Sequence, residues 1–174
     1  MTSETGPTST ATPGEGRSAH LAFLGAALRR PATMGAVAPS SARLGAVLAS
    51  VVPTTGAPVV VELGPGTGAV SAVIAQRLPA GARHLAVELD PDMVAYLRRT
   101  LPGLDVVQGN AADLGTLLAD RGISAADAII CGLPWALFDD TTQTRLLGEI
   151  SRAIGDTGAF TTFAYLHEIG RAHV

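Results

Sequence analysis

Short apolar runs alternate strictly with amphipathic stretches over most of this chain, and no other feature constrains the fold as much. The apolar runs are rich in β-branched residues and cover residues 58–63, 82–89, 104–109, 127–133 and 159–166. The stretches between them have helical periodicity and cover residues 69–78, 91–100, 112–120 and 142–154. No hairpin signal joins neighbouring runs. The sequence therefore predicts an α/β fold in which helices cover both faces of a mostly parallel sheet.

The chain before the first expected strand divides into a tail and a helical segment. Residues 1–17 are mostly Ser, Thr, Gly and Pro with little apolar surface to bury, so we expect a disordered tail. Residues 18–57 are expected to hold two helices. The first covers residues 18–30 and ends before Pro31. The second covers residues 41–51 and has apolar residues at helical spacing, namely Leu44, Val47 and Leu48.

Composition limits the classes of protein to which the chain can belong. Its 174 residues suffice for one domain. The net charge is −3, which lacks the basic surplus of a typical nucleic-acid-binding protein, so nucleic acid is not the expected partner. One cysteine, Cys131, excludes an internal disulfide, and the four histidines have no metal-ligand spacing, so no metal is expected. Neither a signal peptide nor a membrane-spanning apolar run is recognisable, which predicts a cytoplasmic protein, at most peripheral to the inner membrane face.

A glycine-rich segment follows the first expected strand and precedes a helix. It consists of Glu62, Leu63, Gly64, Pro65, Gly66, Thr67 and Gly68. Glycines allow the backbone to turn sharply and to approach a ligand closely, and the following helix adds amides and a positive dipole end. The spacing differs from the G-x-G-x-x-G of nicotinamide sites, and no G-K-[ST] follows. Glu62 would repel a pyrophosphate but suits a ligand with an ammonium and a sulfonium; an ordinary tight turn is the alternative.

Glu88 and Leu89 end the second expected strand, and Glu88 comes 20 residues after Gly68. A carboxylate at this position can accept hydrogen bonds from both hydroxyl groups of a ribose. The alternative is a surface glutamate without a ligand. Asp90 and Asp92 are assigned to the start of the next helix, where acidic groups stabilise the amino end.

Four residues after the third expected strand form another candidate contact, namely Asn110, Ala111, Ala112 and Asp113. Asp113 can accept a hydrogen bond from the amino group of adenine, and the small Ala112 leaves room for the ring. Asp113 can equally cap the short helix that follows. The two roles do not exclude each other.

The fourth expected strand ends in a turn made of Cys131, Gly132, Leu133, Pro134 and Trp135. Backbone carbonyls and an aromatic face at this end of the sheet suit a cationic or amine-bearing substrate. A tryptophan that only packs the loop is the alternative. Cys131 itself has the character of a small buried apolar residue.

Taken together and in this order, these four motifs resemble the motif series of class I S-adenosylmethionine-dependent methyltransferases. The resemblance implies a Rossmann-like three-layer αβα sandwich over residues 58–167 with S-adenosylmethionine as its cofactor. It implies that Glu62 and the glycines hold the methionine end, Glu88 the ribose and Asp113 the adenine. The carbonyls of the Gly132–Trp135 turn would then border the point of methyl transfer.

A narrower resemblance lies in the stretch FLGAALRRPATMGAVAPSSARLG, which is similar to the N-terminal segment of bacterial phospholipid N-methyltransferases. It implies a phospholipid amine as methyl acceptor, converting phosphatidylethanolamine to phosphatidylcholine, and peripheral membrane contact through residues 18–30. Core packing of that helix is the alternative, because only Arg29 and Arg30 supply positive charge. Ribosomal RNA adenine dimethylases share the core but have N-[LI]-P-[YF] after strand four, and Gly132 replaces that Asn here. A small-molecule or RNA methyltransferase and a non-catalytic cofactor-binding fragment stay open as alternatives.

The end of the sequence departs from the class I pattern. The family has a further helix and an antiparallel hairpin after its fifth strand, and both are missing here. Residues 168–174 (EIGRAHV) resemble the translation of a sequencing adapter, so we expect a non-native tail there.

Overall fold

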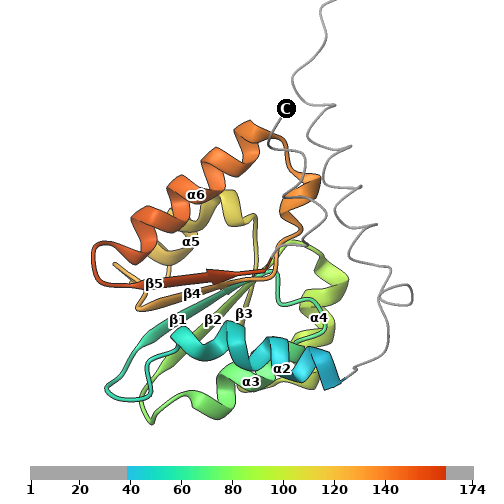
Figure 1. Ribbon diagram of the computed structural model, residues 1–174, viewed down its shortest axis with the longest axis vertical. Coiled ribbons are helices and arrows are strands. Elements are labelled where there is room, and N and C mark those ends of the chain that lie inside the picture. Colours follow the sequence, from blue (N-terminus) through green and yellow to red (C-terminus); the bar gives the residue numbers. More distant parts are fainter. Residues whose placement is uncertain (1–38, 164–174) are drawn as a thin grey trace, which may run out of the picture. The chain divides into compact units, whose positions relative to one another are not determined.

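A computed structural model describes residues 39–163, and five parallel strands form its centre (Figure 1). The strands are β1 (Val59–Leu63), β2 (Arg83–Glu88), β3 (Asp105–Gln108), β4 (Ala128–Cys131) and β5 (Ala159–Thr162). Their order in the sheet is β3-β2-β1-β4-β5, and every neighbouring pair is parallel. The sequence reversal between β1 and β4 creates a topological switch point, where open α/β sheets bind their ligands. The predicted parallel sheet is confirmed.

Helices cover both faces of this sheet. The α-helices are α2 (Pro39–Leu48), α3 (Ala69–Arg77), α4 (Pro91–Thr100), α5 (Leu114–Ala119) and α6 (Asp140–Ile154). Short 3₁₀ turns are η2 (Ala49–Val51), η3 (Ala111–Asp113) and η4 (Trp135–Leu137). In Figure 1, α2, α3 and α4 lie on one face of the sheet and α5 and α6 on the other. The predicted three-layer αβα arrangement is therefore confirmed. The expected tail 1–17, the helix 18–30 and the tail 168–174 lie outside the described residues.

Strands β1 and β4 are buried on both faces, and their sequences are apolar except for Glu62. Val60 and Val61 of β1 point to opposite faces, and both have no exposed surface. Val60 packs in a cluster with Ile74 of α3 and Ile130 of β4. This rigid centre fixes the carboxyl ends of β1 and β4, after which two of the predicted motifs follow.

Helix α2 packs through Gly45 and Leu48, while its other large apolar residues are exposed. A Cβ added at Gly45 would lie 3.2 Å from Cγ2 of Val73, so α2 approaches α3 closely there. Leu48 is buried, but Leu44 and Val47 are 43% and 61% exposed. Helical spacing thus identified the helix, while only one of the three apolar residues that define the spacing faces the core.

Aspartate and asparagine side chains begin three of the helical segments. Asp90 accepts a hydrogen bond from the amide of Asp92 at 2.8 Å, which confirms its assignment to the start of α4. Asp139 caps α6 by accepting from the amide of Thr142 at 2.7 Å, so that α6 begins at Asp140, two residues earlier than expected. Asn110 caps η3, and the helix expected over 112–120 begins with this tighter turn.

Candidate functional site

The loop between β1 and α3 has a backbone that favours glycine. Gly64, Gly66 and Gly68 have φ values of +70°, +55° and +81°, in the left-handed region. A Cβ added at Gly66 would meet nothing within 4 Å, whereas one added at Gly68 would lie 2.6 Å from Leu101. Pro65 is buried, and Thr67 is exposed. The loop is packed on one side and open above Gly66, as a ligand cradle requires.

Glu62 lies deep below this loop, with 2% of its surface exposed. Its carboxylate accepts a 2.6 Å hydrogen bond from Oγ of Ser71 in the first turns of α3. Nε2 of His84 on β2 lies 3.2 Å from the same carboxylate. No sequence motif includes His84, although strand alternation places it and Glu62 on the same face of neighbouring strands. These contacts tie α3 and β2 to the strand that carries the glycine loop.

The carboxylate of Glu88 meets the glycine loop at the end of β2. It accepts hydrogen bonds from the amides of Leu89 at 2.8 Å and Asp90 at 3.0 Å. Its other oxygen lies 3.3 Å from the amide of Gly66. The alternative of a surface glutamate is wrong, because only 1% of Glu88 is exposed. A buried carboxylate held by backbone amides beside an open glycine is a preorganised acceptor.

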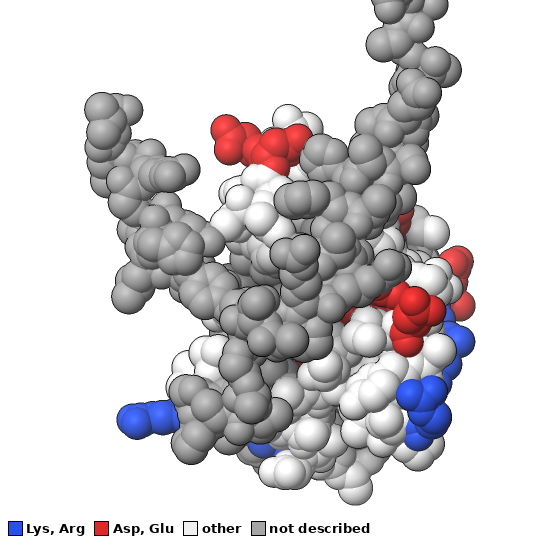
Figure 2. All heavy atoms as spheres, turned by 90° about the vertical axis from the view of Figure 1, so that its right-hand side faces the viewer, with Lys and Arg blue, Asp and Glu red and all other residues white. Residues whose placement is uncertain are grey.

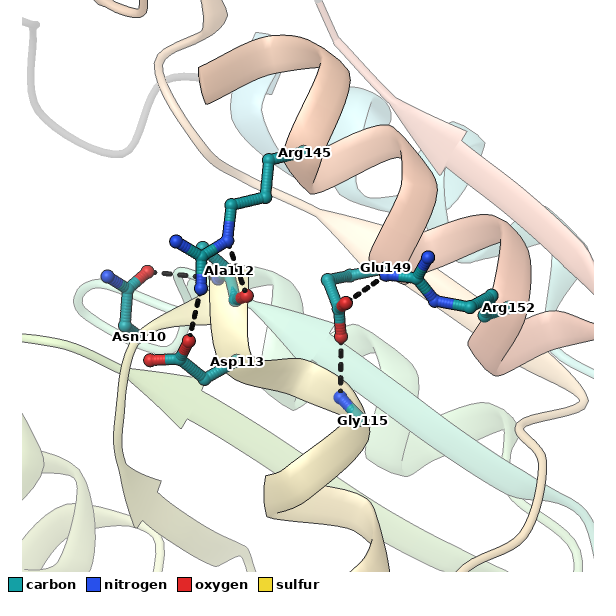
Figure 3. Close-up of polar contacts among 7 residues, drawn as sticks. All are labelled: Asn110, Ala112, Asp113, Gly115, Arg145, Glu149 and Arg152. Carbon is teal, nitrogen blue, oxygen red and sulfur yellow. Dashed lines mark hydrogen bonds and ion pairs between the residues drawn. The ribbon is translucent and has the colours of Figure 1, made fainter. Parts of the chain in front are cut away.

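The segment after β3 is held by hydrogen bonds to α6 (Figure 3). Oδ1 of Asn110 accepts from the amide of Ala112 at 2.9 Å. Arg145 of α6 donates to Oδ1 of Asp113 at 2.6 Å and to the carbonyl of Ala112 at 3.2 Å. The capping role considered for Asp113 is wrong, because its side chain makes no cap hydrogen bond and Asn110 caps the turn instead. Ala111 and Ala112 are buried, at 8% exposure each, while about half of the Asp113 side chain is exposed.

A second contact from α6 holds the start of α5. Glu149 accepts a hydrogen bond from the amide of Gly115 at 2.9 Å and pairs with Arg152 (Figure 3). The Gly115 amide is the main cause that lowers the pKa of Glu149, and Arg152 adds to the effect. Through these hydrogen bonds, α6 holds in place the segment that follows the carboxyl end of β3.

The turn after β4 packs directly against the glycine loop. The amide of Gly132 donates to the carbonyl of Leu63 at 2.8 Å. A Cβ added at Gly132 would lie 2.7 Å from the carbonyl oxygen of Gly64, and one added at Gly64 would lie 2.8 Å from Leu133. The first and fourth predicted motifs are therefore in backbone contact, because β1 and β4 are neighbours in the sheet.

Trp135 is half-buried and is contacted from two other elements. Its indole Nε1 donates to Oγ1 of Thr162 at the end of β5, at 2.7 Å. Its ring meets that of Phe138 edge-on, with centroids 6.2 Å apart. Gln143 of α6 donates to the carbonyls of Trp135 at 3.2 Å and of Phe138 at 3.0 Å. Thr162 and Gln143 carry no sequence signal of this role, because the strand order alone brings them to the turn.

Cys131, at the start of the turn, has no exposed surface and a pKa raised to about 11 by burial. Its thiolate form is therefore disfavoured in the folded chain. We expect no alkylation by iodoacetamide in the native protein at about pH 8 and rapid alkylation once the protein is unfolded in urea. Mass spectrometry of both samples measures this, and modification of the native protein at a similar rate would contradict the burial of the thiol.

The same shift predicts how stability depends on pH. The unfolded thiol ionises near its ordinary pKa of 9.0, while the folded one stays protonated until about pH 11. The unfolded state therefore holds fewer protons in this window, and the free energy of unfolding contributed by Cys131 falls as the pH rises through it. Urea unfolding across this window, with Cys131→Ala as the control lacking the thiol, isolates this contribution.

The described residues hold neither a metal site nor a membrane span. No group of three or more His, Cys, Asp or Glu within residues 39–163 could hold a metal ion. In the same range, no helix combines the length and the apolar character that crossing a membrane requires. On the face in Figure 2, charged side chains of the described residues are scattered between uncharged atoms rather than gathered into one basic field.

Comparison with known sequences gives two matches that span most of the described chain. The methyltransferase domain family matches residues 60–158. The ornithine lipid N-methyltransferase of Singulisphaera acidiphila is 36% identical over 141 residues, which are 79% of this chain and 73% of that protein.

Solved structures share the fold at low sequence identity. The TehB-like SAM-dependent methyltransferase of Corynebacterium glutamicum superposes with a TM-score of 0.53 at 18% identity, over 88% of this chain and 80% of that one. The SAM-bound amino pentose methyltransferase CalS10 of Micromonospora echinaspora superposes with a TM-score of 0.54 at 20% identity, over 92% of this chain and 61% of that one.

Proposed function

Because the chain belongs to the class I S-adenosylmethionine-dependent methyltransferases, we propose that it methylates the primary amine of a lipid head group. S-adenosylmethionine is its cofactor. The similarity to an ornithine lipid N-methyltransferase supports a lipid amine as acceptor. The candidate acceptors in this proposal are phosphatidylethanolamine and ornithine lipid, each of which carries a primary amine. Contact with the inner membrane face through residues 18–30 belongs to the same proposal, and these residues lie outside the described part of the chain.

The observation that carries the proposal is the meeting of the glycine loop, Glu88 and the Gly132 turn. The space above Gly66 is open, and Glu88 lies beside it. These residues fit the cofactor: the loop and Glu62 would hold the methionine end, Glu88 the ribose, and the segment 110–113 the adenine. When bound, the cofactor supplies a methyl group on a sulfonium, which is already activated for transfer.

The turn after β4 would orient the acceptor. The carbonyls of Leu133 and Pro134 accept hydrogen bonds from Trp135 and Leu137 within the turn. Among the described residues, none donates a hydrogen bond to the carbonyl of Gly132. We therefore assign the contact with the amine to this carbonyl rather than to the other carbonyls of the turn. A carbonyl that accepts an N–H of the neutral amine directs the nitrogen lone pair away from itself, and half-buried Trp135 helps to exclude water.

The chemical step consists of one displacement. The amine lone pair forms the N–C bond while the S–C bond breaks, and the resulting methylammonium loses a proton to water. The protein's contribution is orientation and desolvation, because the methyl group needs no further activation. Gly132 has no side chain that could act on the amine, so its backbone carbonyl is the group that we propose to accept the N–H of the amine.

Methyl transfer to vesicles tests the proposal. Vesicles with phosphatidylethanolamine or ornithine lipid are expected to accept methyl groups from labelled S-adenosylmethionine, and phosphatidylcholine vesicles are not. Free ethanolamine, free ornithine and RNA serve as the competing acceptors, with Glu88→Ala as the inactive protein control. Methylation of RNA or of the free amines with both lipid vesicles ignored would replace the lipid proposal by the alternative acceptor. Cofactor binding without transfer to any acceptor would support a non-catalytic fragment.

A further inference from the structure

We propose that Thr162 is a positioning residue that orients the indole of Trp135 for the methyl acceptor. The inference rests on the proposed function, because it assigns the turn after β4 to the acceptor. Thr162 ends β5, on the far side of β4 from the glycine loop. No motif of the sequence includes it.

The hydroxyl of Thr162 joins the indole to the strand that carries the turn. Its Oγ1 accepts from Nε1 of Trp135 at 2.7 Å and lies 3.1 Å from the carbonyl of Cys131, to which it can donate. Since Cys131 is the last residue of β4, the rigid sheet fixes the hydroxyl and the hydroxyl fixes the indole. An indole has a single N–H donor, so this bond determines the direction of the ring edge.

The other contacts of Trp135 leave this direction open. Gln143 holds the carbonyl of Trp135, and so acts on the backbone of the turn. Phe138 meets the indole edge-on across 6.2 Å, a contact that favours an edge-to-face arrangement but offers the indole N–H no acceptor. The buried thiol of Cys131 also lies within hydrogen-bond reach of Trp135 and Thr162. Because sulfur is a weak acceptor, Thr162 is the stronger of the two described acceptors that can select one orientation of the half-buried ring.

The effect is expected on the acceptor and not on the cofactor. Within the described part of the chain, the hydrogen bonds of Thr162 join only β4, the turn and the residue after β5, and none reaches Glu88 or the segment 110–113. Loss of the hydroxyl should raise the KM for the lipid amine about three- to tenfold, the value of one hydrogen bond, while the affinity for S-adenosylhomocysteine stays unchanged.

The experiment compares Thr162→Val, which keeps the shape and removes the hydroxyl, with Thr162→Ser, which keeps the hydroxyl. Thr161→Val is the matched control, because successive side chains of a strand point to opposite faces. Trp135 is the only tryptophan of the chain, so its emission and its quenching by acrylamide report directly on the indole. Kinetics with phosphatidylethanolamine vesicles measure the KM for the lipid amine, and calorimetry measures the affinity for S-adenosylhomocysteine.

We expect Thr162→Val to change the emission, increase quenching and raise the acceptor KM, with Thr162→Ser close to wild type and Thr161→Val unchanged. Wild-type emission and KM in Thr162→Val would overturn the inference, and so would equal effects in Thr161→Val. If no lipid amine is methylated by any variant, the proposed acceptor fails. The fluorescence arm then still decides whether Thr162 orients Trp135, so the two failures are distinguishable.

Discussion

Gly132→Ala is expected to destabilise the fold and to remove cofactor binding together. The new Cβ would lie 2.7 Å from the carbonyl oxygen of Gly64, and a backbone atom held by the sheet cannot move aside as a flexible side chain would. Crowding of this kind costs about 1–3 kcal/mol, and any relief must shift the glycine loop. Urea unfolding and calorimetry with S-adenosylhomocysteine measure the two effects.

Gly103→Ala is the matched control for this substitution. A Cβ there meets nothing within 4 Å, and Gly103 does not have a positive φ, so the change should be neutral or slightly stabilising. Wild-type stability and binding in Gly132→Ala would contradict the close approach of the two loops.

Substitution of Glu88 is expected to give the largest loss of cofactor affinity. If the carboxylate accepts both ribose hydroxyls, Glu88→Ala removes two charge-assisted hydrogen bonds and lowers the affinity for S-adenosylhomocysteine by about 100-fold or more. It also leaves the amides of Leu89 and Asp90 without their acceptor, at a cost to stability of about 1–3 kcal/mol. Calorimetry and urea unfolding separate the two losses.

Glu88→Gln distinguishes the ligand role from the structural one. Glutamine keeps one oxygen for the amides of Leu89 and Asp90 but turns its NH2 group toward the amide of Gly66. The loss of stability should therefore be smaller than in Glu88→Ala, while affinity still falls by about tenfold. Asp92→Asn, on the exposed first turn of α4, is the control that removes a nearby charge without touching the loop. Equal binding heats in wild type, Glu88→Ala and Gly66→Val would remove Glu88 and the glycine loop from the cofactor site.

The sheet was predictable because parallel strands buried on both faces leave a direct sequence signal. The run that contains Val60 and Val61 is apolar except for Glu62, and the alternation of such runs with helices determines that the strands are parallel. The exposure of Leu44 and Val47 was not predictable, because it depends on the close approach of Gly45 to α3. Helical spacing predicts a helix, but it does not say which face meets the neighbour.

The candidate site likewise contains features that the sequence predicts and contacts that it does not predict. Motifs that lie at strand ends, such as Glu88, could be predicted from their position along the chain. Contacts that depend on which strands are neighbours could not. His84 reaches Glu62 and Thr162 reaches Trp135 only because β2 lies beside β1 and β5 beside β4. Asp113 pairs with Arg145 because α6 packs against the turn that follows β3, a contact that the local sequence does not reveal.

The backbone contact between Gly64 and Gly132 also sets a limit on redesign. If the Gly132 turn borders the point of transfer, as proposed, a change of acceptor preference would be attempted by placing a new side chain there, but position 132 has no room for one. New specificity must therefore enter through Leu133 and Trp135, or through β5. A turn grafted from a relative with a larger residue at this position would need a compensating change in the glycine loop, so the two loops must be exchanged as a pair.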